Sequence, residues 1–151
     1  MRLILRQRTL KPLGMRNYDI YDESGKCVYL AEQQLCFPRR WHIIDTAQRQ
    51  IATVQKRFWR IQLVIHGECA DIARRRGMRR KYRFLTQGWD AACAAFADDF
   101  IVRTPQGRTV ALAEGAPEKN SFRIETIQEE NALLVLLFAV GVRKHGFGLR
   151  I

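Results

Sequence analysis

The stretch Ala132–Val142, with the sequence ALLVLLFAVGV, is an unbroken apolar run of eleven residues in the last part of the chain. A helix that spans a membrane needs about 20 apolar residues, whereas this run stops at Arg143 and Lys144. A helix that is apolar on every side must be buried, and this length favours burial inside protein rather than lipid. We therefore expect the rest of the chain to close around this helix.

The residues that flank the run favour a helix. Thr126 and Glu129 have the spacing of a capping box, in which each side chain accepts a hydrogen bond from a free backbone N–H group of the other residue. Acidic residues before the run suit the positive end of the helix dipole and basic residues after it suit the negative end; they are Glu129, Glu130, Arg143, Lys144 and His145.

The totals indicate one globular domain, residues 1–151, large enough to bury a core. Hydrophobic residues make up 47% of the chain, which argues against disorder. The net charge is +11, from 26 Lys and Arg against 15 Asp and Glu. Such a charge attracts phosphates on nucleic acids or anionic lipids, but it does not determine the fold.

The first residues indicate a cytoplasmic protein. Residues 1–8 contain neither the apolar core nor the cleavage site of a signal peptide. The cysteines lie far apart in the sequence, and we expect reduced, partly buried thiols; they are Cys27, Cys36, Cys69 and Cys93.

A twelve-residue pattern occurs three times, in residues 18–29, 41–52 and 100–111. Without gaps, Trp41 aligns with Tyr18, Asp45 with Asp22, and Gly107 with Gly25. Each copy has strand-like ends around a centre rich in turn residues, which predicts a β-hairpin. Repeated hairpins in a small chain favour a sheet that closes on itself, because closure removes exposed edges.

The other segments add further short strands. Tyr82 and Phe84 alternate with Lys81 and Arg83, as expected for a strand with one buried face. The segment 89–96 fits either a strand or a short Ala-rich helix. The remaining predicted strands are 2–8, 61–66, 69–74 and 121–125, with a tight turn at 66–68 and an optional strand at 147–151. The prediction is a mainly β (α+β) protein, a closed antiparallel barrel of about twelve strands around a buried C-terminal helix.

The segments YDIYDESGKCVY (18–29), WHIIDT (41–46) and DFIVRTPQGRTVA (99–111), followed by the apolar helix, resemble the LURP-one-related group. This group belongs to the tubby C-terminal-like superfamily, which also includes phospholipid scramblases. The resemblance extends from Met1 to Val142 and implies a barrel threaded by one helix. Tubby domains bind phosphoinositides through basic side chains on the barrel exterior, but no such residue matches a position here. The short helix argues against scrambling.

The densest basic cluster surrounds a predicted turn at Gly77. A hairpin tip there presents its cations together to phosphates, or is simply a solvated loop, and we weigh the two equally. The cluster consists of Arg74, Arg75, Arg76, Arg79, Arg80 and Lys81.

Two smaller groups combine cations with aromatic residues. Arg39 and Arg40 precede Trp41, and Lys56 and Arg57 precede Phe58, Trp59 and Arg60. Aromatic side chains beside cations suit lipid headgroups or stacked bases. We favour the commoner explanation, in which Trp41, Phe58 and Trp59 belong to the core.

Neither a metal site nor a catalytic site is predicted, and we expect no cofactor. The cysteines form no C-x-x-C pair, and the three histidines complete no ligand motif. We expect Asp98 and Asp99 to be a solvated entry to a strand. Cys36 with His42, or Cys69 with His66, is a conceivable thiolate pair, but small buried cysteines in a barrel core are the better explanation.

The leading functional hypothesis is a non-enzymatic module that binds an anionic partner through its basic exterior, at a membrane headgroup surface. The candidate residues are those of the three basic groups. One alternative is a protein-interaction or scaffold barrel whose charge only keeps it in solution. Another is nucleic-acid binding, which the charge supports but which no recognisable motif accompanies.

Overall fold

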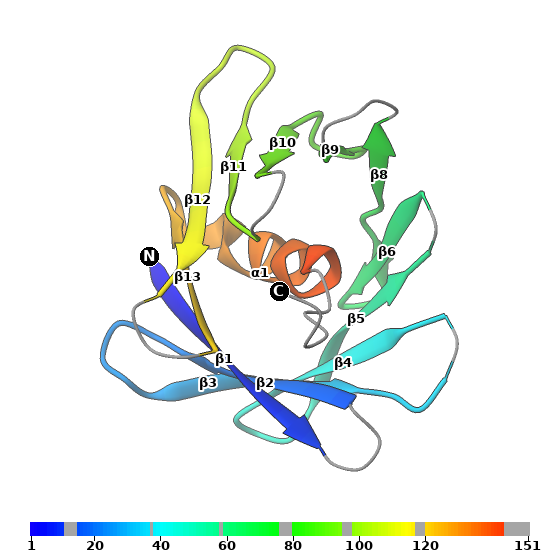
Figure 1. Ribbon diagram of the computed structural model, residues 1–151, viewed down its shortest axis with the longest axis vertical. Coiled ribbons are helices and arrows are strands. Elements are labelled where there is room, and N and C mark those ends of the chain that lie inside the picture. The colour runs from blue at the N-terminus through cyan, green and yellow to red at the C-terminus, as the bar shows by residue number, and fades with distance from the viewer. Residues whose placement is uncertain are drawn as a thin grey trace, which may run out of the picture.

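The computed structural model describes residues 1–10, 15–36, 38–57, 59–75, 80–94, 98–116 and 120–143, which form a ring of strands around one helix (Figure 1). The strands are β1 (Arg2–Leu10), β2 (Met15–Tyr21), β3 (Cys27–Gln33), β4 (Arg40–Asp45), β5 (Gln50–Lys56), β6 (Arg60–Ile65), β7 (Glu68–Cys69), β8 (Ile72–Arg75), β9 (Lys81–Phe84), β10 (Asp90–Cys93), β11 (Phe100–Arg103), β12 (Thr109–Gly115) and β13 (Ser121–Thr126). A 3₁₀ helix, η1 (Glu129–Asn131), leads into α1 (Ala132–Val142).

The strands form one closed antiparallel sheet in the order β5-β4-β3-β2-β1-β13-β12-β11-β10-β9-β8-β6, and β6 pairs back with β5. On the other side of β6, Val64 pairs with Cys69 of β7 and Ile61 with Ile72 of β8. Because β7 and β8 lie end to end along β6, they fill one position, and the barrel is twelve strands around. The predicted fold class is confirmed.

Closure depends on one pairing between distant parts of the chain. Neighbours in the ring are otherwise close in sequence, whereas β1 pairs with β13 from Arg2↔Glu125 to Arg6↔Ser121. The Met1 ammonium group extends this ladder by donating a 2.9 Å hydrogen bond to the Thr126 carbonyl oxygen.

Helix α1 fills the barrel, as Figure 1 shows. Its side chains are buried apart from Leu133, which is partly buried. The ring of Phe138 packs against three aromatic rings of the wall, those of Tyr82, Phe84 and Phe100, at centroid distances of 5.3, 5.2 and 4.9 Å. The predicted helix, its bounds and its burial inside protein are all confirmed.

The predicted capping box is wrong. Thr126 belongs to β13, and its hydroxyl donates a 3.4 Å hydrogen bond to the Met1 carbonyl oxygen instead of capping a helix. The N-cap residues of η1 and α1, Gln128 and Asn131, make no side-chain capping bond. The 3₁₀ turn replaces the predicted cap.

The three predicted hairpins are the pairs β2–β3, β4–β5 and β11–β12, and their turns have the same backbone hydrogen bonds. In each turn, the first residue donates to the carbonyl of the fifth and accepts from the N–H of the fourth. The fourth residue has a positive φ of 84°, 63° or 86°. The first, fourth and fifth residues are Asp22, Gly25 and Lys26, then Asp45, Gln48 and Arg49, then Thr104, Gly107 and Arg108.

The structure also decides the open assignments. Residues 90–93 are strand β10, so the helical alternative for 89–96 is wrong. His66 and Gly67 form the predicted tight turn, with φ values of 49° and 83°. The segment 147–151 lies outside the described residues.

Candidate anion-binding site at one end of the barrel

The three basic stretches of the sequence meet at one end of the barrel, which we call the basic end. The Lys56 N–H donates a 2.8 Å hydrogen bond to the Arg39 carbonyl oxygen, which joins the end of β5 to the start of β4. The Arg74 N–H donates to the Trp59 carbonyl at 2.8 Å, and Arg75 pairs with Lys81 across β8 and β9. The stretches are distant in sequence but continuous along the edge of the sheet. Of their predicted site residues, Arg76 and Arg79 lie outside the described residues, as does Phe58.

Strand alternation divides these cations into two sets, because every second side chain faces the same side of a sheet. Arg40, Arg75 and Lys81 face outward, whereas another set continues the inward-facing register of the buried core residues. We call this second set the lumenal ring: Arg16, Arg39, Lys56, Arg74, Arg80 and Asp98 from the wall, with Arg143 from the end of α1.

The lumenal ring surrounds the C-terminal end of α1. Arg80 Nη2 donates a 2.6 Å hydrogen bond to the Val142 carbonyl oxygen. The Asp98 carboxylate lies 4.0 Å from Arg80 Nη1 and 3.7 Å from Arg143 Nε. The guanidinium carbon of Arg143 lies 5.0 and 5.5 Å from the ring centroids of Phe122 and Tyr18.

These contacts correct two predictions. Arg80 was expected at an exposed hairpin tip, but it is only 9% exposed because it bonds to the helix inside the barrel. Asp98 was expected to be solvated, but it is also 9% exposed, because it lies between two guanidinium groups.

The ring is electrostatically crowded. Burial, together with the positive charges of Arg80 and Arg39, lowers the pKa of Lys56 to about 8, while Asp98 acts in the opposite direction. Burial also lowers the pKa of Arg16, and the nearby Arg143 and Arg39 contribute. The ring contains six cations and one carboxylate, so positive charge exceeds negative charge around the end of α1.

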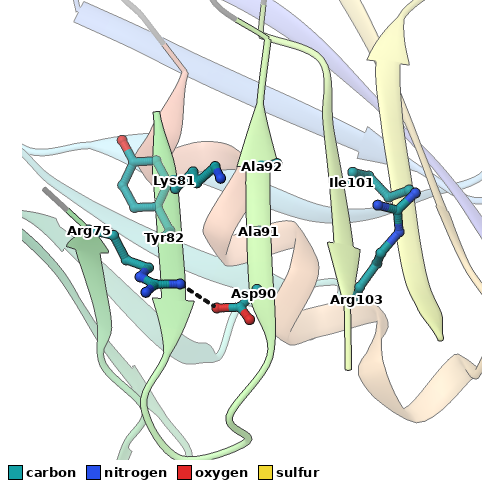
Figure 2. A pocket seen from close by; sticks show the side chains of 8 residues that line it. All are labelled: Arg75, Lys81, Tyr82, Asp90, Ala91, Ala92, Ile101 and Arg103. Atoms are coloured by element: carbon teal, nitrogen blue, oxygen red, sulfur yellow. Dashed lines mark ion pairs between the residues drawn. The ribbon is translucent and has the colours of Figure 1, made fainter. Parts of the chain in front are cut away.

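A shallow cleft of about 170 Å³ lies on the outer face of β8 to β11 (Figure 2). Asp90 in this cleft pairs with Arg75 at 3.7 Å and with Arg83 at 3.1 Å. Within the described chain, no ion pair involves Lys81, which stands opposite Ala92 in the sheet, or Arg103, which stands opposite Asp90. The cleft therefore contains two cations that form no ion pair with a described residue.

Exposed apolar side chains accompany the cations of the basic end. Trp41 is fully buried, as predicted, but Trp59 is 52% exposed, so its assignment to the core is wrong. Arg74 lies over the Trp59 ring, with its guanidinium carbon 5.6 Å from the centroid. Leu35, in the connection between β3 and β4, is 77% exposed.

The cysteines form no disulfide, and their burial differs from the prediction. Cys27 and Cys93 are partly buried, but Cys36 and Cys69 are exposed, so they are not core residues. Among the described residues, no three His, Cys, Asp or Glu side chains are grouped closely enough to hold a metal ion.

Sequence reasoning missed Arg16, Asp98 and Arg143 of the ring and Arg103 of the cleft as site residues. Two of them could have been found from strand alternation. Arg16 stands two residues before Tyr18 and Asp98 two before Phe100, so each faces the same side as a buried aromatic residue. Arg143 was assigned only to the helix dipole.

Comparison with known proteins supports the fold. The chain superposes on the X-ray structure of a protein from Arabidopsis thaliana with a TM-score of 0.61 and 12% identity, over 92% of this chain and 88% of that one. This likeness shows that the two chains share a fold. No family model matches the sequence, and no curated protein does. No helix within the described ranges is long and apolar enough to cross a membrane.

Proposed function

We propose that the protein is a non-enzymatic module that binds anionic phospholipid headgroups at a membrane surface through the basic end of its barrel. The observation that carries the proposal is the meeting of three basic stretches along one edge of the sheet, beside exposed Trp59 and Leu35. We further propose that the chain is a LURP-one-related member of the tubby-like superfamily, which the shared barrel supports.

Charge and apolar exposure act together in such a module. Each Lys or Arg close to an anionic leaflet contributes about 1 kcal/mol of attraction, and Trp is enriched at membrane interfaces. Arg40, Arg75 and Lys81 provide the charge on the outer face, and Trp59 and Leu35 provide the exposed apolar surface at the edge. Because α1 is buried, the membrane contact must be made by the exterior of the barrel.

Vesicle co-sedimentation tests this function. The chain should bind vesicles that contain phosphatidylserine or phosphatidic acid, should not bind phosphatidylcholine vesicles, and should be released by salt. Replacing both Arg40 and Lys81 with Gln removes about 2 kcal/mol of attraction, which corresponds to a roughly 30-fold weaker vesicle affinity. Trp59→Ala should weaken binding with little change in its salt dependence.

The matched control is the pair Arg49→Gln and Arg108→Gln, which removes the same charge from turns at the opposite end of the barrel. Equal losses in the control and the test variants would show that only net charge matters and would contradict the proposal. Tighter binding to single-stranded RNA than to anionic vesicles would favour a nucleic-acid partner instead. No binding to either would favour the scaffold alternative.

A further inference from the structure

We propose that the lumenal ring is a binding site for one phosphate-class oxyanion, held by Arg143 at the C-terminal end of α1. This site lies inside the barrel, so it is separate from the outer surface assigned to membrane headgroups. Its ligand is a free phosphate, a soluble phosphate monoester or the headgroup of a single lipid, which share the same chemistry.

The first argument is charge. Among the described residues, the charged side chains that are more than nine-tenths buried are Arg16, Arg80, Arg143 and Asp98, three cations against one anion. Lys56 and Arg39 are two further cations close to this group. The last carbonyl groups of α1 offset part of this excess. Buried charges are normally paired, so a bound anion completes the balance.

The second argument is the geometry of Arg143. Its side chain is 9% exposed, yet Nε and Nη1 make no hydrogen bond, and the nearest Asp98 oxygen is 3.7 Å from Nε. The neighbouring hydroxyl of Tyr18 is also buried, beside the side chains of Arg16 and Arg143. Phosphate oxygens suit both groups, because they accept hydrogen bonds from guanidinium N–H groups and from hydroxyl groups.

Positioning favours the same conclusion. The rings of Tyr18 and Phe122 hold the Arg143 guanidinium, and the indole N–H of Trp41 donates to the Arg16 carbonyl oxygen at 3.1 Å. The ring contacts order the Arg143 side chain, and the Trp41 bond fixes the backbone at Arg16, before any ligand binds, which lowers the entropy lost on binding.

The third argument is a graded route inward. Arg74 is exposed at the edge of the barrel, Arg39 and Lys56 are half-buried, and Arg143 is buried. An anion that moves inward from the edge thus meets cations of increasing burial. Low-dielectric walls strengthen its attraction along this route.

Thermal unfolding of the full chain tests the site, with inorganic phosphate or sn-glycerol 3-phosphate compared with chloride at equal ionic strength. A ligand that binds only the folded state raises Tm with its concentration, so both phosphates should raise Tm and chloride should not. Arg143→Gln should weaken the apparent phosphate affinity at least tenfold. Arg108→Gln, which removes the same charge at the opposite end, should leave it unchanged.

Tyr18→Phe provides a second variant that is expected to fold, because it removes only the hydroxyl and keeps the buried ring. It should keep the Tm in chloride and weaken phosphate binding several-fold, and it decides the test if Arg143→Gln does not fold. If only phosphatidic acid vesicles raise Tm, and Tyr18→Phe weakens binding to those vesicles, the ligand is a lipid headgroup. The proposal is overturned if phosphate and chloride change Tm equally and vesicles have no such effect. It is also overturned if Arg108→Gln loses as much phosphate affinity as Arg143→Gln.

The two proposals fail separately. Trp59→Ala with Lys81→Gln should lose vesicle binding but retain the Tm response to phosphate. A phosphate response without any vesicle binding overturns only the membrane function, and vesicle binding without a phosphate or Tyr18 effect overturns only the lumenal site.

Discussion

Arg80, the residue before β9, donates a 2.6 Å hydrogen bond to the carbonyl oxygen of Val142, which joins the barrel wall to the last turn of the enclosed helix. The last carbonyl groups of a helix have no partner within it, and here a charged side chain from a distant strand provides one. Both residues are buried, at 9% and 1% exposure. The contact fixes the helix within the barrel.

The first prediction concerns this contact. Arg80→Met should lower the free energy of unfolding by about 3 kcal/mol, because it leaves the Asp98 carboxylate in a buried site with one fewer cation. Urea unfolding followed by circular dichroism measures the change. Arg83→Gln is the control, since Arg83 lies on the same strand and pairs with Asp90 at the surface; it should cost less than about 1 kcal/mol. Equal losses would show that Arg80 contributes only surface charge.

The second prediction concerns Gly141, where the helix approaches the wall closely. A Cβ atom there would lie 2.8 Å from Ile61 Cγ2 and 3.1 Å from Val54 Cγ1, both in the buried core. Gly141→Ala should therefore destabilise the protein by about 1–3 kcal/mol, although Ala is the better helix former. The control, Gly115→Ala, places its Cβ where no atom lies within 4 Å. A gain in Tm for Gly141→Ala would contradict the close contact.

The third prediction uses the repeated turn. Gln48 has a φ of 63° at the position that Gly25 and Gly107 occupy in the other two copies. A side chain in this left-handed region costs about 1 kcal/mol or more, so Gln48→Gly should raise Tm. Gly25→Ala and Gly107→Ala should each lower the free energy of unfolding by about 1 kcal/mol. We therefore expect the substitution at Gln48 to stabilise the protein and those at Gly25 and Gly107 to destabilise it. A stability change of the same sign at all three positions would refute their equivalence.

The fourth prediction concerns pH. Lys56 has a pKa of about 8 in the folded protein, below the ordinary value of 10.5, chiefly because of burial. Between these values the unfolded chain binds more protons, so stability should rise with pH from about 8 towards 10. Above pH 10 the trend should reverse, because burial raises the pKa of Tyr18 and Tyr82.

Lys56→Met should remove the rise between pH 8 and 10 and should stabilise the protein at pH 7. Lys26→Met, at an exposed turn, is the control and should retain the rise. Urea unfolding in chloride buffers at several pH values measures both. A flat wild-type profile over this range would contradict the burial of Lys56.

The repeated hairpins and the apolar run could be predicted from the sequence because their signals are local. Turn residues such as Asp22 and Gly25 act within five residues, and the run 132–142 is too apolar to be exposed. The capping box failed because Thr126 also fitted a strand, and its pairing partner, Met1, is distant in sequence.

The candidate site was predicted only in outline. Local sequence identified its basic segments, but their shared edge depends on strand order and register. Arg80 and Asp98 were treated as exposed because charged residues usually are, although alternation places both on the inner face. Trp59 alternates in phase with the buried residues Ile61 and Leu63, which suggested a core position. However, it precedes strand β6 and is exposed at the edge of the barrel.

The pairing of β1 with β13 has a consequence for synthesis on the ribosome. Arg2 and Glu125, which are partners in this ladder, are separated by 123 positions in the chain. While the earlier strands emerge, the helix that will cover their apolar faces has not been translated. The ring can therefore close only after synthesis of these strands is complete, and the nascent meander exposes apolar surface until then. Chaperones that shield apolar segments are expected to bind during that interval.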